Sequence, residues 1–150
     1  MIKKRAMFIT PTDMYDLYGN GGVKGSQKNY KLVEEYFGKE NTFLCTFPRK
    51  TDTIPPKNAI TFRRTQTPQG QLISALFGCK VYLPWDEKSL IRFINDKKID
   101  LLFIDCSTLG RLAKVKGDFK KIVFYHNIEG DYAWNKVKNE IGRASCRERV

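Results

Sequence analysis

The chain has 150 residues, of which 41% are hydrophobic and 29% are charged, and its formal net charge at pH 7 is +11. This composition is typical of a globular protein, and no apolar run approaches the roughly 20 residues that a bilayer-spanning helix needs. The excess of positive charge predicts an anionic partner, which is a nucleic acid, a membrane surface or a charged glycan.

Hydrophobic periodicity divides the chain into alternating strands and helices. The predicted strands are residues 6–10, 41–47, 60–62, 100–105 and 121–125, and the predicted helices are residues 26–37, 67–77, 86–98, 109–115 and 131–140. We expect Ser26 to cap the first helix and Gly38 to end it. The runs at 100–105 and 121–125 are almost continuously apolar, as in strands that are covered on both faces. The fold class is therefore α/β, with a Rossmann-like parallel sheet and helices on both faces.

A glycine-rich segment, Gly19 to Gly25, follows the first strand and precedes the first helix. Glycines there allow backbone N–H groups near a helix start to approach an anion, so a phosphate or carboxylate cradle is one interpretation. A flexible connection is the other, because neither the dinucleotide fingerprint nor the P-loop order is present. The segment offers Gly21, Gly22 and Val23 as phosphate-binding backbone, and Asn20 and Lys24 beside them as side chains that bind the acceptor or the sugar.

Polar residues also follow two later strands. Asp105 comes directly after residues 101–104, and His126, Asn127 and Glu129 follow residues 121–125. In a parallel sheet these strand ends share one edge with the glycine-rich segment, where open α/β sheets bind ligands. His126 is the only histidine and is either a catalytic group or an ordinary surface residue. The others either bind sugar hydroxyls or cap local turns.

Cysteine and histidine spacing does not support a metal site. The four cysteines show no C-x-x-C spacing, and one histidine cannot complete a ligand set, so we expect no metal and no cofactor. The basic N-terminus lacks a cleavage site for a signal peptide. A reduced, cytoplasmic protein is expected.

The last ten residues, Ile141 to Val150, match the translation of a short-read sequencing adapter. We treat 141–150 as a non-native tail and 1–140 as one domain, and we expect the natural chain to continue beyond Glu140. Without the tail's net charge of +2, the formal charge of the domain is +9, so the positive charge does not come from the tail.

The domain resembles the N-terminal half of bacterial family 4 glycosyltransferases of the GT-B type. Three segments carry the resemblance: the strand ending in Ile9-Thr10-Pro11, the glycine run 19–24 with Asn29-Tyr30 on the following helix, and the strand end at 124–129. The resemblance implies two Rossmann-like domains that face each other across a cleft. It also implies that Gly21 and Gly22 approach the donor diphosphate and that His126 and Asn127 lie near the transferred sugar.

The resemblance further implies a retaining transferase that moves a sugar from a nucleotide-sugar to a surface polysaccharide or a lipid-linked glycan. The donor-binding half is absent from this sequence, so we expect the fragment alone to be inactive. Peripheral contact with the inner face of an anionic membrane would fit the charge, and no specific nucleic acid is expected. The alternative is a non-catalytic α/β module that binds a phosphorylated ligand or nucleic acid.

Overall fold

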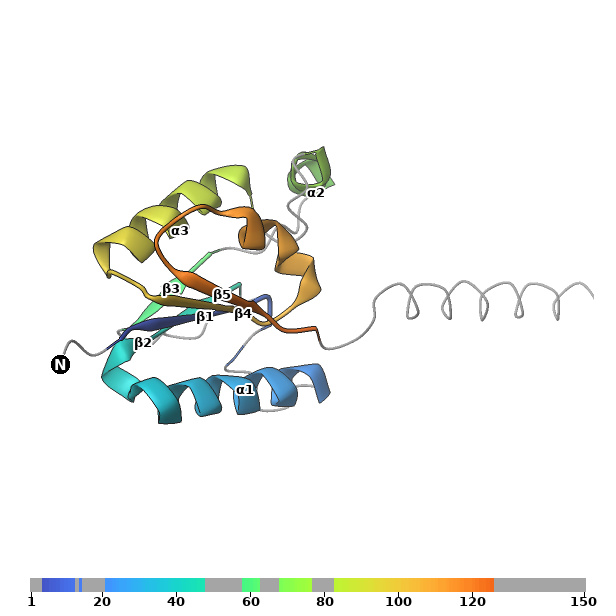
Figure 1. The fold of residues 1–150 in the computed structure, drawn as a ribbon. Coiled ribbons are helices and arrows are strands. Elements are labelled where there is room, and N and C mark those ends of the chain that lie inside the picture. The colour runs from blue at the N-terminus through green and yellow to red at the C-terminus, as the bar shows by residue number, and fades with distance from the viewer. Residues whose placement is uncertain are drawn as a thin grey trace, which may run out of the picture.

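The computed structural model describes residues 4–12, 14, 21–47, 58–62, 68–76 and 83–125. Five strands form one all-parallel sheet in the order β3-β2-β1-β4-β5 (Figure 1). The strands are β1 (Ala6–Thr10), β2 (Thr42–Thr46), β3 (Ala59–Thr61), β4 (Leu101–Ile104) and β5 (Lys120–Val123). The helices are α1 (Gly21–Phe37), α2 (Pro68–Leu76), α3 (Pro84–Asp96) and the 3-10 segments η1 (Lys39–Asn41) and η2 (Ser107–Lys114). The predicted α/β class with a parallel sheet is confirmed.

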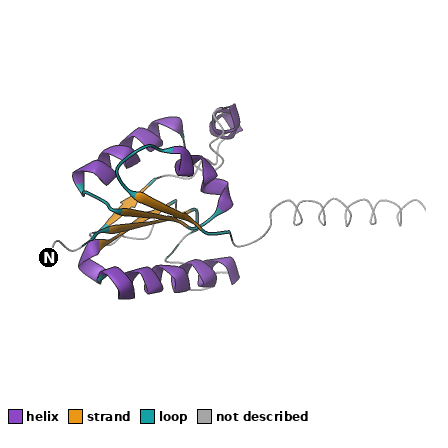
Figure 2. Cartoon of the chain, in the orientation of Figure 1, coloured by secondary structure: helices purple, strands orange, loops and turns teal. Residues whose placement is uncertain are grey.

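Helices cover both faces of the sheet (Figure 2). The chain moves from β1 through α1 to β2 in one direction along the sheet, and from β4 through η2 to β5 in the other. Because crossovers between parallel strands are right-handed, the two connections lie on opposite faces. Helix α1 lies on one face, and α3 with η2 lies on the other (Figure 1).

Each face has its own hydrophobic core, because successive strand residues point to opposite sides of the sheet. Met7, Ile9 and Leu102 pack with α3 and η2, whereas Phe8 and Leu44 pack with α1. Strands β1 and β2 are buried along their whole length. They occupy the middle of the sheet, so both of their faces are covered.

The first helix begins earlier than predicted. It starts at Gly21, and Ser26 is buried within it instead of capping it. The Ser26 hydroxyl lies 3.5 Å from that of Thr10 and 3.4 Å from that of Thr12, so it joins the helix to the end of β1. These contacts hold the preceding turn in helical form, which periodicity alone could not reveal. The predicted stop at Gly38 is confirmed by its φ of +86°.

The last predicted strand is also different in character. β5 is an exposed edge strand, not a buried one, because open space remains between it and α1. β4 is fully buried only at Leu102 and Ile104, which point toward α3 and η2. The short helix predicted at 109–115 is a 3-10 segment at 107–114. The helix predicted at 131–140 and the tail at 141–150 lie outside the described residues.

Candidate functional site

The candidate site is the carboxyl edge of the sheet between β1 and β4. Here the strand order changes direction: β2 and β3 follow on one side of β1, and β4 and β5 follow on the other. β1 and β4 are neighbours, but their following segments, α1 and η2, leave toward opposite faces. In open α/β sheets this divergence leaves a crevice at the strand ends, which is the usual ligand site. The predicted residues Gly21, Gly22 and Asp105 belong to the two segments that border it.

A network of hydroxyl groups fixes the turn at the end of β1. The backbone N–H of Thr12 donates to Thr10 Oγ1 at 3.2 Å, and Thr46 Oγ1 on β2 donates to the Thr12 carbonyl at 2.7 Å. Ser26 adds the contact from α1, and Thr10, Ser26 and Thr46 are fully buried. The network therefore sets where α1 begins relative to the sheet. Sequence reasoning missed it because isolated threonines and serines carry no spacing signal.

The first turn of α1 has the features of an anion-binding helix start. Gly21, Gly22 and Lys24 are exposed, whereas Val23 is buried. The helix dipole is positive at this end and favours a nearby anion. A Cβ placed on Gly21 would meet no other atom within 4 Å, so the space above it is open to a ligand. Lys24 adds a cation one turn further along.

Asp105 lies beneath α1 and not at its N-terminus. Its side chain is fully buried, and its Oδ1 accepts a hydrogen bond of 2.9 Å from Asn29 Nδ2. Asn29 is eight residues beyond Gly21, or roughly 12 Å along the helix axis. In this arrangement Asp105 ties α1 to the end of β4. Its predicted contact with ligand hydroxyls stays a prediction.

The other predicted site residues lie outside the described part of the chain. These are Asn20, His126, Asn127 and Glu129. The chain leaves β5 with the Phe124 N–H donating to the Ile104 carbonyl at 2.8 Å, so the segment before His126 runs beside the end of β4. Among the described residues, no group of three histidine, cysteine or acidic side chains is placed to hold a metal ion, and no helix is long and apolar enough to cross a membrane.

Two cysteines near this edge differ in environment. Cys45 on β2 is fully buried, and burial, together with the nearby charge of Asp86, raises the pKa of its thiol. Cys106, directly after Asp105, is half-buried and accepts a hydrogen bond from Thr108 Oγ1 at 3.2 Å. Because the thiolate is the reactive form, Cys45 should be inert in the native protein.

We expect iodoacetamide at pH 8 to alkylate Cys106 at least about ten times faster than Cys45, as measured by peptide mass mapping. In guanidinium chloride the two rates should become similar. Equal rates in the native protein would contradict the buried placement of Cys45. A Cys106→Ser variant checks the assignment of the fast site.

No family model, curated protein or solved structure matches this chain. The fold and the candidate site therefore rest on the sequence and the structure of the chain itself.

Proposed function

We propose that this chain is the N-terminal, acceptor-side part of a retaining GT-B glycosyltransferase of family 4, which transfers a sugar from a nucleotide-sugar to a surface polysaccharide or lipid-linked glycan. The observation that carries the proposal is the position of the glycine segment. Gly21 and Gly22 form the exposed start of α1 at the strand-order reversal of a parallel sheet. A nucleotide diphosphate is an anion suited to that position.

The proposal divides the work between two domains. The described residues supply the positive end of the α1 dipole, the open space above Gly21 and the exposed Lys24 cation on one side of a cleft. The proposal assigns the groups that stabilise the departing diphosphate to a second domain, and in that case the residues of this chain alone are expected to bind the donor weakly without catalysing transfer. His126, Asn127 and Glu129 act near the transferred sugar, and the resemblance of residues 124–129 to the family supports this assignment.

The competing proposal is a binding module for a phosphorylated ligand or nucleic acid. The same exposed helix start supports it, since anion binding there needs no second domain. Peripheral contact with a membrane fits both the net charge of +9 that remains without the tail (11 − 2) and a lipid-linked acceptor.

The decisive experiment reads the source DNA across codon 140 and expresses the complete protein. We expect a second βα-rich domain, and release of nucleoside diphosphate when the complete protein is supplied with UDP- or GDP-sugars. A natural stop codon directly after this chain would refute the transferase and leave the binding module. A complete two-domain protein that hydrolyses or transfers no sugar across the panel would also count against the transferase.

A further inference from the structure

Basic residues that are scattered in the sequence meet at the amino edge of the sheet, opposite the candidate site. They belong to the segments that lead into β1, β4 and β5, which are neighbours in the sheet. In the part of these segments that the structure describes, the exposed cations are Lys4, Arg5, Lys97, Lys98, Lys116 and Lys120. The acidic residues in the same segments are Asp96, Asp100 and Asp118. We call this surface, with its six cations and three acids, the basic edge.

Hydrogen bonds hold the basic edge together. The Asp100 N–H donates to the Arg5 carbonyl at 2.9 Å, and the Lys120 N–H donates to the Asp100 carbonyl at 2.8 Å. Arg5 also donates from Nη1 to the Lys97 carbonyl at 2.8 Å, so its guanidinium helps to fix the turn before β4. The backbones that carry these cations are therefore fixed side by side, whereas most of the lysine side chains extend into solvent.

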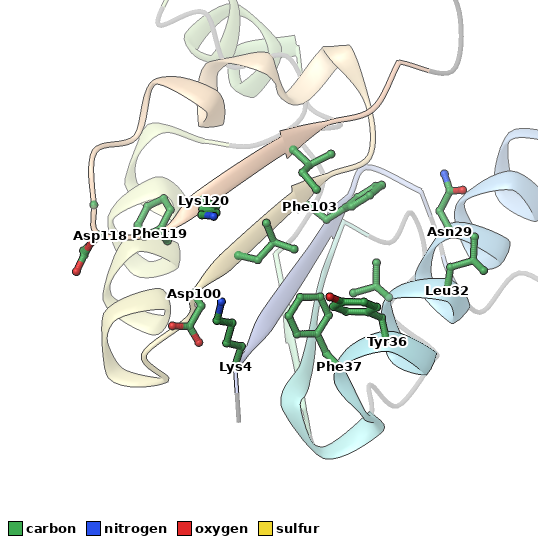
Figure 3. A pocket seen from close by; sticks show the side chains of 14 residues that line it. Lys4, Asn29, Leu32, Tyr36, Phe37, Asp100, Phe103, Asp118, Phe119 and Lys120 are labelled. Atoms are coloured by element: carbon green, nitrogen blue, oxygen red, sulfur yellow. The ribbon is translucent and has the colours of Figure 1, made fainter. Parts of the chain in front are cut away.

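An apolar groove adjoins the basic edge. Helix α1 covers only part of the sheet face on which it lies. A groove of about 800 Å³ therefore remains between α1 and β5, with β4 as its floor (Figure 3). Its walls are apolar, and Lys4, Asp100, Asp118 and Lys120 lie at its end on the basic edge. Leu32 is 55% exposed and Tyr36 is 83% exposed on the α1 side. Exposed apolar groups beside lysines are the combination found where proteins contact bilayer interfaces.

We propose that the basic edge docks on an anionic membrane, with lipid headgroups on the lysines and an acyl chain in the groove. This deepens the peripheral contact of the proposed function and rests on it for its biological setting. Charge complementarity selects the partner: a second copy, itself strongly positive, would be repelled. A nucleic acid is less suited, because five of the six cations are lysines, the one arginine is engaged by Lys97, and the adjoining surface is an apolar groove.

The test measures binding of the full 150-residue chain to vesicles by co-sedimentation. Vesicles with about 30% phosphatidylglycerol should bind the protein, and pure phosphatidylcholine vesicles should not. Since each lysine near an anionic surface contributes on the order of 1 kcal/mol, replacing Lys98, Lys116 and Lys120 by glutamine should lower the partition coefficient about 100-fold. The matched control replaces Lys28, Lys88 and Arg92, exposed cations on α1 and α3, and should change it less than about threefold.

The apolar part has its own pair of variants. Tyr36→Ser at the groove should weaken binding several-fold without changing its salt dependence, whereas Trp85→Ser, at the start of α3, should not. The proposal would be overturned if the triple variant of the basic edge and the control triple variant lost equal amounts of vesicle binding. Equal binding of the protein to neutral and anionic vesicles would also overturn it. Failure of the protein to bind anionic vesicles would also overturn it. The same holds if replacing Lys98, Lys116 and Lys120 weakens binding to single-stranded DNA but not to vesicles. None of these measurements requires transferase activity, so the docking proposal and the transferase proposal fail independently.

Discussion

Replacing Gly21 by valine is expected to lower the turnover of the complete enzyme by about 100-fold, comparable with the loss of one preorganised donor to a developing anion. The side chain would fill the space above the first N–H groups of α1, where the diphosphate is proposed to lie. A Cβ at this position meets no other atom within 4 Å, so the folded protein accommodates it. Initial rates with a nucleotide-sugar and thermal denaturation of the same preparation measure the two effects.

The control for this variant is Gly110→Val. Gly110 lies in η2 on the opposite face, and a Cβ there also meets nothing within 4 Å. Turnover should stay within about twofold of the natural enzyme. If Gly21→Val were as active as Gly110→Val at equal folded fraction, the glycine segment would be a simple connection, and the proposed phosphate role would be lost.

Replacing Asn29 by leucine is expected to destabilise the domain by about 2–3 kcal/mol. The change removes the Nδ2 donor 2.9 Å from Asp105 Oδ1 and leaves a fully buried carboxyl group with one hydrogen bond fewer. It also separates the middle of α1 from the end of β4. Urea denaturation at pH 7 gives the change in the free energy of unfolding.

A double-mutant cycle shows whether the pair is the cause. Asn29→Leu with Asp105→Leu should cost less than the sum of the two single changes, since replacing both partners leaves no polar group buried without its donor. Lys28→Leu, on the exposed side of α1, should change stability by less than about 0.5 kcal/mol. Additive costs in the cycle would mean that the hydrogen bond does not join α1 to β4.

The strands in the middle of the sheet were predictable from sequence as short apolar runs between turn residues. Residues 6–10 and 41–47 were predicted as strands, and β1 and β2 are buried along their whole length. The continuous apolar runs at 100–105 and 121–125 instead predicted strands covered on both faces, and β4 is fully buried only at alternate residues while β5 is exposed. Alternation with helices then required a parallel sheet, and Gly38 marked the end of α1 because its φ of +86° suits glycine. These features depend on local chemistry, which the sequence states directly.

The burial of β5 could not be predicted in the same way. Its sequence is as apolar at Ile122 and Val123 as that of a central strand, yet Ile122 is 45% exposed. Burial depends on which helix lies over a strand: α1 packs with residues of β1 and β2, whereas an open groove separates it from β5. The groove beside β5 exists for the same reason, and no periodicity in the sequence encodes it.

The sequence by itself determined the α/β class, the order of the elements and the placement of the glycine segment and Asp105 at strand ends. Only the tertiary structure decided that α1 begins at Gly21, that Asp105 is buried against Asn29, and that the lysines before β1, β4 and β5 form one edge. The physical reason is that local propensity and periodicity act over a few residues. Strand order, by contrast, is decided by packing between segments up to about a hundred residues apart, such as Arg5 and Asp100.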